Sequence, residues 1–231
     1  MRLVSILAFV GLASGCANDG DAGMFVLNNS APPAGTVCTF TGEQAQLFTS
    51  AGSISAYSTE TNAAASGYIL SPLIESRITT TSDVQIPQRT IHLEGANITA
   101  QVNGNGVKQQ YTALFAGSLA PGGTTNVSFE ALPVPSIMAF EPSKTDNILV
   151  VLTVQIFGTL GGSRIDADPF QYPVTIVGEG KGIVFGVTNL CTVPGSVART
   201  GNACNPFQDG TVDCCLSKSG RLVCPAIAEL P

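Results

Sequence analysis

Cysteine is the residue type in this chain with the most chemistry available to it. There are seven cysteines: Cys16, Cys38, Cys191, Cys204, Cys214, Cys215 and Cys224. Cys16 follows an apolar N-terminal run, whereas the last five all lie within residues 191–231. A cysteine behind a leader can carry lipid, and cysteines exported to an oxidising compartment form disulfides. The spacing therefore predicts lipidation at one end of the chain and cross-linking at the other.

The first fifteen residues have the organisation of an export leader. Met1-Arg2 is a short positive start, Leu3–Leu12 is an apolar run, and the residues that follow it are small. Such a run is too short to cross about 30 Å of hydrocarbon as a helix. Residues 1–15 are therefore predicted to be a signal peptide.

The residues around Cys16 resemble a bacterial lipobox, in which a signal peptidase cuts before a cysteine that carries a diacylglyceryl group. Ser14 and Gly15 precede the expected cut, and Cys16 becomes the new N-terminus. The resemblance implies palmitate-type acylation of Cys16 and membrane attachment through that lipid. Ala17, beside the acylated residue, favours the outer membrane. An ordinary secretory signal cleaved nearby is the alternative, and it also exports the chain.

The stretch that follows Cys16 is predicted to be a lipidated flexible tether, spanning residues 16–35. Its first part, Ala17–Gly23, consists of small and polar residues. Chains of that composition behave as flexible linkers.

The six cysteines from Cys38 onward form an even set, which predicts up to three disulfides in fifteen connectivities that the sequence leaves open. Structural zinc is the alternative, but it prefers cysteines two to four residues apart, and only the adjacent pair Cys214-Cys215 is close. We therefore expect disulfides and no metal. Cys38 has no near neighbour, so we expect it to bond with one of the five C-terminal cysteines.

The body of the chain is predicted to be all-β, as an immunoglobulin-like β-sandwich over residues 36–190, with a disulfide-rich C-terminal segment over 191–231. Short apolar and β-branched runs separated by Gly and Pro are typical of this class. The strand-like runs are 36–40, 68–73, 89–102, 111–115, 126–131, 147–157, 173–177 and 183–187.

Two of these runs carry more specific information. In 89–102 the apolar residues change parity at Gly95, which predicts a β-bulge there. In 147–157 one face is continuously apolar, whereas Thr153 and Gln155 interrupt the other. We therefore expect a strand with one dry face and one partly wet face.

The C-terminal segment contains a distinctive pattern, Gln208-Asp209-Gly210 followed by Asp213-Cys214-Cys215. The segment from Gly201 to Pro225 is similar to Cys-rich segments of uncharacterised cell-envelope lipoproteins of myxobacteria and related bacteria. This resemblance covers about 25 residues. It implies export and anchoring, and it implies no particular activity.

The remaining chemistry-bearing residues are sparse. His92 is the only histidine, and we expect it to be a solvated strand residue because no nucleophile motif accompanies it. Asp166 and Asp168 could ligate calcium, but too few carboxylates accompany them, so a solvated loop is favoured. The glycines of 178–182 lack the following Ser or Thr of a phosphate-binding loop and favour a hairpin tip.

The charge of the chain argues against nucleic acid as a partner. The net charge is -6, and only 11% of the residues are charged. An acidic chain without a basic patch does not bind nucleic acid. The expected partners are the membrane, through the N-terminal lipid, and a protein of the envelope, with no cofactor. The sequence therefore predicts a structural or binding module. The alternative is an extracytoplasmic hydrolase whose carboxylates come from loops.

Overall fold

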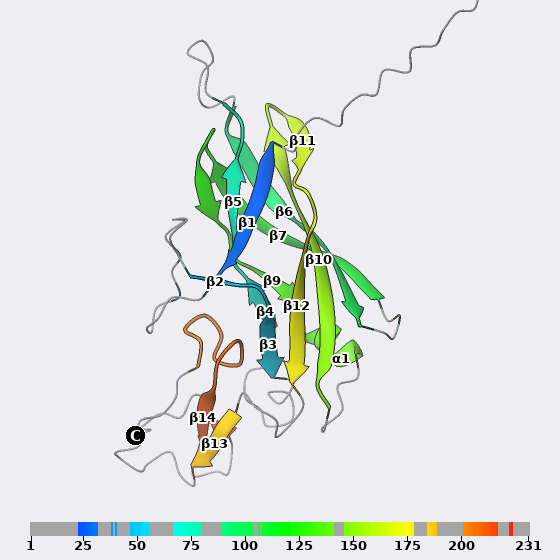
Figure 1. Ribbon diagram of the computed structural model, residues 1–231, viewed down its shortest axis with the longest axis vertical. Helices are drawn as coiled ribbons and strands as arrows, with labels where there is room; N and C mark the ends of the chain where they lie inside the picture. Colours follow the sequence, from blue (N-terminus) through cyan, green and yellow to red (C-terminus); the bar gives the residue numbers. More distant parts are fainter. Residues whose placement is uncertain are drawn as a thin grey trace, which may run out of the picture.

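Period-two alternation of apolar and polar residues becomes strand structure along the described chain, and the fold is all-β, as predicted. The computed structural model describes residues 23–31, 38, 40, 47–55, 67–79, 89–103, 106, 108–140, 146–177, 184–188, 201–216 and 222–223. Within those ranges the helix is α1, Val134–Ala139. Figure 1 shows how the strands are arranged.

The larger sheet is built around β10, the longest of the described strands. Its order is β3-β12-β10-β6-β7, and β11 pairs with the far end of β10. All its pairings are antiparallel except that of β3 with β12. The strand bounds are β3 Gly52–Ser55, β6 Ile91–Val102, β7 Lys108–Leu119, β10 Ile148–Leu160, β11 Ser163–Asp166 and β12 Phe170–Val177.

A smaller sheet has the order β2-β1-β5-β8, and β4 pairs with β9 in a separate ribbon. The bounds are β1 Met24–Ser30, β2 Phe48–Thr49, β4 Tyr68–Leu70, β5 Pro72–Ser76, β8 Thr124–Asn126 and β9 Phe129–Leu132. One hydrophobic core joins these sheets. Met24, Ile74, Leu132 and Leu152 are fully buried in it. Burying a side chain of this size stabilises the folded chain by about 1.5–3 kcal/mol.

The C-terminal part forms its own small sheet and also returns to the body. β13 (Val184–Thr188) pairs in parallel with β14 (Val212–Leu216), and β15 (Leu222–Val223) pairs with β14. Between β13 and β14, Gln208 makes an isolated bridge to Ile54 of β3. The strand predicted for 183–187 is therefore present, with the tail as its partner.

The β-bulge predicted at Gly95 is confirmed. Against β10, Phe157 pairs with Gly95 and Gly158 pairs with Leu93, so Glu94 is an extra residue in β6. The apolar side chains on both sides of this irregularity are buried, although their sequence parity differs. The bulge therefore keeps the apolar side chains of both halves of β6 directed into the core.

Gly95 also has no room for a side chain. A Cβ at this position would lie 2.6 Å from the backbone oxygen of Ala113 and 2.8 Å from a ring atom of Phe157. The close approach of β7 and of the Phe157 ring therefore requires glycine at the bulge.

Two expectations for the N-terminal part need correction. The flexible tether predicted for residues 16–35 is wrong over Met24–Ser30, which form β1 and pair with β5. The physical reason is burial, because Met24 is fully enclosed in the core. The strand predicted for 36–40 is also wrong at Cys38 and Phe40, which lie outside any strand.

In the described ranges, no helix has the length and apolar character needed to cross a membrane.

Candidate functional site

The described cysteines are cross-linked. Cys38 is bonded to Cys204 across a sequence separation of 166 residues, which agrees with the expectation that Cys38 reaches a C-terminal cysteine. Cys214 and Cys215 are buried and are also disulfide-bonded. Cys16, Cys191 and Cys224, together with the glycine-rich stretch 178–182, lie outside the described residues.

The other candidate residues lie on the surface. His92 is exposed on β6, as expected of a solvated strand residue. Asp166 forms an ion pair with Arg164 at 2.8 Å, and Asp168 is exposed in the following turn. The described ranges contain no group of three or more His, Cys, Asp or Glu side chains that could hold a metal ion.

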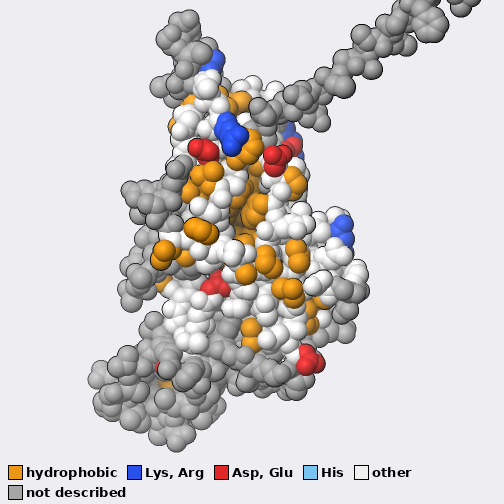
Figure 2. Space-filling model, viewed as in Figure 1, with side chains coloured by type: hydrophobic (Ala, Val, Ile, Leu, Met, Phe, Trp, Pro, Cys, Tyr) orange, Lys and Arg blue, Asp and Glu red, His pale blue; other side chains and the backbone are white. Residues whose placement is uncertain are grey.

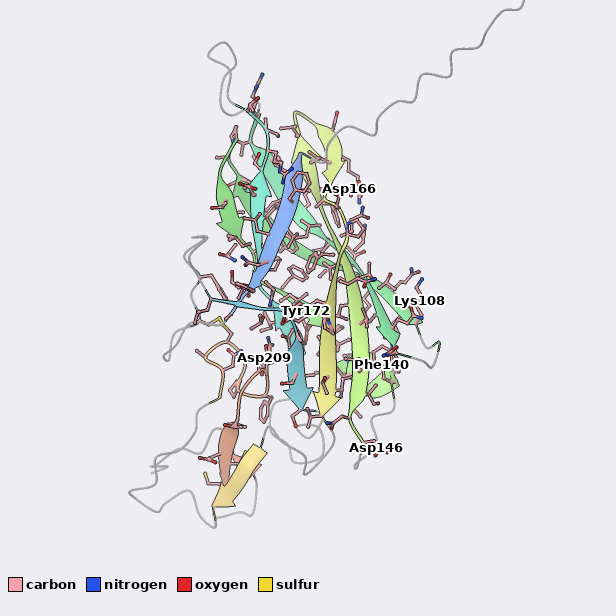
Figure 3. All side chains as sticks on the ribbon, in the orientation of Figure 1. Lys108, Phe140, Asp146, Asp166, Tyr172 and Asp209 are labelled. Carbon is pink, nitrogen blue, oxygen red and sulfur yellow. A yellow bond between two sulfur atoms is a disulfide. The ribbon has the colours of Figure 1, made fainter. Side chains whose placement is uncertain are left out.

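A buried chain of hydroxyl groups ends at Asp209 and is the most elaborate polar arrangement in the described structure. Tyr68 Oη lies 2.6 Å from Asp209 Oδ2 and 3.1 Å from Tyr172 Oη. Tyr172 Oη lies 2.8 Å from Thr49 Oγ1, which accepts a hydrogen bond from Asn29 Nδ2 at 3.0 Å. Figure 3 labels Tyr172 on β12 and Asp209 on the tail. We call these five residues the tyrosine–aspartate chain.

The chemistry of its two ends fixes the direction of every hydrogen bond in the tyrosine–aspartate chain. Tyr68 donates to Asp209 and must therefore accept from Tyr172, because a hydroxyl has one proton to give. Tyr172 in turn accepts from Thr49, which accepts from the amide of Asn29. All donors thus point toward the carboxylate, an arrangement in which each bond polarises and strengthens the next.

Asp209 is held by the backbone of β3 as well as by side chains. Its Oδ1 accepts from the Ser53 amide at 2.6 Å, and its Oδ2 accepts from Gln208 Nε2 at 3.1 Å. Together with Tyr68, these are donors only, so they suit an ionised, acceptor-only carboxylate. Asp209 also adopts a positive φ of 51°, which aspartate tolerates better than most residues.

Gln208 attaches the same segment to β4. Gln208 Oε1 accepts from the Ile69 backbone N–H at 2.8 Å, and Gln208 Nε2 donates to the Ile69 carbonyl at 2.7 Å. The side chain thus takes the place of a neighbouring strand for β4. Asn205 Nδ2 donates to the Gly67 carbonyl at 2.9 Å. The tail thus lies between β3 and β4 and provides hydrogen bonds to both.

Burial perturbs the ionisation of this site. It raises the pKa of Tyr68, and the nearby Asp209 and Tyr172 raise it further. The pKa of Tyr172 is also raised, chiefly by burial. Burial raises the pKa of Asp209 above its usual value, while the hydrogen bonds from Tyr68, Ser53 and Gln208 oppose that shift. The two tyrosines therefore remain protonated donors, and the arrangement is suited to holding the tail in place.

A second polar region lies on the outer face of the large sheet, opposite the core. A hollow of about 480 Å³ opens there over β6, β7 and β10. Its lining residues are Asn97, Ile98, Thr99, Gln110, Tyr111, Thr112, Thr153, Gln155 and Pro169. Thr153 and Gln155 are the two residues expected on the wet face of β10, and the alternating Val150 to Ile156 side chains of the other face are fully buried. This expectation is confirmed.

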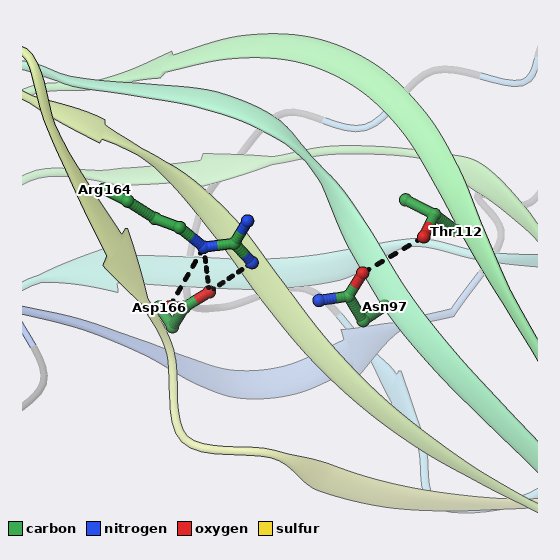
Figure 4. A network of polar contacts seen from close by, with 4 residues as sticks. All are labelled: Asn97, Thr112, Arg164 and Asp166. Carbon is green, nitrogen blue, oxygen red and sulfur yellow. Dashed lines mark hydrogen bonds and ion pairs between the residues drawn. The ribbon is translucent and has the colours of Figure 1, made fainter.

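Hydrogen bonds link side chains across the strands of this face. Thr112 Oγ1 donates to Asn97 Oδ1 at 3.1 Å. Figure 4 shows this pair and, separately, the ion pair of Arg164 and Asp166. The Arg164 guanidinium also lies over the Phe157 ring, 4.5 Å from its centroid, and the hydrogen bond with Asp166 raises the pKa of Arg164. Arg164 and Asp166 therefore neutralise each other.

Sequence reasoning identified only parts of these two regions. The Gln208-Asp209-Gly210 pattern was recognised as distinctive, but nothing in the sequence linked it to Tyr68 or Tyr172. A Gln-Asp-Gly turn behind a cysteine in a mainly uncharged chain is the signal that could have indicated a buried carboxylate.

Comparisons with known proteins give little further information. No protein-family model matches the sequence, and no curated protein matches it. Among solved structures, the chain is similar to a crystal structure of a protein from Archaeoglobus fulgidus, with 14% identity and a TM-score of 0.32. That match covers 49% of this chain and 87% of the other. A likeness this weak carries no argument about fold or function.

Proposed function

We propose that this chain is an extracytoplasmic, lipid-anchored protein of the bacterial cell envelope that acts as a structural or binding module. Ala17, beside the acylated cysteine, favours the outer membrane. The observation that carries the proposal is the Cys38–Cys204 disulfide, with Cys214 and Cys215 also oxidised. Structural disulfides of this kind persist in oxidising, extracytoplasmic compartments.

The proposed anchor is the diacylglyceryl group on Cys16, exposed as the N-terminus when residues 1–15 are removed. Each buried CH₂ contributes about 0.8 kcal/mol, and stable anchoring needs more than one acyl chain. A diacylglyceryl group meets that requirement. The chain carries a net charge of -6, so attraction to anionic headgroups adds nothing. The resemblance of the tail to envelope lipoproteins of myxobacteria supports the same proposal.

The architecture suits a module that presents surfaces. The shared core between the sheets supports a sandwich-like arrangement of the body, and the C-terminal segment is fastened to it by hydrogen bonds and a disulfide. Charged side chains are few and scattered on the face drawn in Figure 2. A rigid, sparsely charged body on a lipid anchor is suited to contact with an envelope protein or an envelope polymer.

No specific observation favours the alternative, an extracytoplasmic hydrolase with loop carboxylates. Asp166 is paired with Arg164, and Asp209 is engaged by donors on both of its oxygens. A binding or structural role therefore has the better support.

Metabolic labelling with an alkyne-bearing fatty acid tests the anchor. Cells expressing the wild-type chain, the Cys16→Ala variant and the matched control Cys38→Ala are labelled and the protein is captured. We expect label on the wild type and on Cys38→Ala and none on Cys16→Ala. Equal labelling of Cys16→Ala and wild type, or no label on any of the three, overturns the proposed anchoring.

A further inference from the structure

The hollow on the outer face of the large sheet has the geometry of a small binding platform. Two rows of side chains cross β7, β6 and β10 in register. One row is Thr112, Asn97 and Gln155, and the next is Gln110, Thr99 and Thr153. Strands lie about 4.8 Å apart, and alternate residues are about 7 Å apart along a strand. The six side chains therefore form a grid of about 10 Å by 7 Å.

The grid presents unused hydrogen-bonding groups. Asn97 Oδ1 accepts from Thr112, which leaves the Asn97 amide protons unassigned. Thr99 Oγ1 accepts from Gln110 Nε2 at 3.3 Å, which leaves the Thr99 proton and Gln110 Oε1 available. The grid thus offers amide and hydroxyl groups that both donate and accept.

The lining of the hollow selects the kind of ligand. None of its nine residues carries a charge at neutral pH, and the phenol of Tyr111 donates to the Ala131 carbonyl at 2.6 Å. A charged ligand would find no counter-charge among these lining side chains. A ligand with large apolar groups would meet mainly amide and hydroxyl side chains. A ligand rich in hydroxyl groups and without charge matches this chemistry.

We propose that Asn97, Thr99, Gln110, Thr112, Thr153 and Gln155 form a binding site for a neutral carbohydrate. The volume of about 480 Å³ lies within the roughly 300–1,000 Å³ usual for ligand sites. The grid has the extent of one or two sugar rings, whose hydroxyl groups can pair with side chains on adjacent strands. This inference rests on the proposed binding role, and it names the ligand class; it does not depend on the anchor.

The test is titration of the disulfide-bonded full chain, purified in a zwitterionic detergent, with neutral oligosaccharides. Maltohexaose, cellohexaose and hexa-N-acetylchitohexaose are the probes, and an oligogalacturonate of similar length is the anionic comparison. Amide and side-chain NMR shifts report the site, and the titration gives the dissociation constant. We expect a neutral probe to shift the six grid residues and to saturate in the millimolar range.

Substitutions on the grid separate a real site from nonspecific contact. The double variant Asn97→Ala/Gln155→Ala removes amides from one row, and we expect it to weaken binding about tenfold or more because several hydrogen bonds are lost. Ser118→Ala, an exposed position of β7 outside the hollow, is the matched control and should bind as the wild type does. Both variants should keep the wild-type thermal midpoint, since the substituted side chains face solvent.

Several results overturn the carbohydrate site. They are the absence of any shift at the grid with all neutral probes at about 10 mM, unchanged binding by the double variant, and tighter binding of the oligogalacturonate. The Cys16→Ala variant keeps the two proposals distinguishable. If it loses acylation yet binds the neutral probe, both proposals stand; if wild type is acylated but binds no probe, only the carbohydrate site fails.

Discussion

Replacing Tyr68 with Phe removes one hydroxyl from the centre of the tyrosine–aspartate chain and leaves the ring in the core. The lost hydroxyl donates to Asp209 Oδ2 at 2.6 Å and accepts from Tyr172 at 3.1 Å. A hydrogen bond to a charged group is worth about 1.5–3 kcal/mol, whereas one between neutral groups is worth about 0.5–1.5 kcal/mol. We therefore expect the free energy of unfolding at pH 7 to fall by about 3 kcal/mol.

The pH dependence of this loss identifies its cause. Burial raises the pKa of Asp209 above the usual 3.8, and the Tyr68 hydroxyl opposes that shift. The folded chain therefore binds the Asp209 proton more tightly than the unfolded chain, and its stability falls as the pH rises through the folded pKa. Without the hydroxyl the folded pKa rises further, so the stability lost by the variant grows over that interval. Below the unfolded pKa, Asp209 is neutral in both states, and the loss should shrink to about 2 kcal/mol, the value of two neutral hydrogen bonds.

Urea unfolding with the disulfides intact, read at pH 3 and pH 7, measures both effects. Tyr111→Phe is the matched control, because its buried hydroxyl donates to a neutral acceptor, the Ala131 carbonyl, at 2.6 Å. We expect that control to lose about 1 kcal/mol at both pH values. The reasoning is refuted if Tyr68→Phe loses no more than Tyr111→Phe at pH 7, or if its loss is the same at both pH values.

Three further substitutions test the fold around these sites. Gly95→Ala should lower the free energy of unfolding in urea by about 1–3 kcal/mol, because the added methyl group has no room at the bulge. Gly122→Ala, where φ is 65° and the space is open, should lower it by about 1 kcal/mol. Equal losses for the two variants would contradict the steric argument. The double variant Cys38→Ala/Cys204→Ala should lower the free energy of unfolding by up to about 5 kcal/mol, since the disulfide closes a loop across a separation of 166 residues. An unchanged urea midpoint would contradict a stabilising role for this disulfide. His92→Ala should change the thermal midpoint by an amount equivalent to less than about 0.5 kcal/mol, because the side chain is exposed; a large loss of stability would show that the imidazole has a structural role.

The features that sequence predicted well depend on neighbours along the chain. The parity change at Gly95 is visible in a few residues, because a strand with one buried face must alternate with period two. The same rule placed Thr153 and Gln155 on the wet face of β10, where they line the hollow. Local alternation of apolar and polar residues therefore predicts part of the outer face without any information on the partner strands.

The features that sequence missed depend on distant parts of the chain. Tyr68, Tyr172 and Asp209 come together only when β4, β12 and the tail are packed, and their spacing in the sequence contains no trace of that contact. Tyrosines with apolar neighbours also look like ordinary core residues. Met24–Ser30 were missed for a related reason, since their pairing with β5 decides that they form a strand and not part of the tether.

The most direct test of the proposed function is the mass of the N-terminal peptide of the protein isolated from the envelope. The account predicts a chain that begins at Cys16, with a diacylglyceryl group on its sulfur and residues 1–15 removed. An N-terminal peptide that retains Met1, or one that contains Cys16 without lipid, would contradict it.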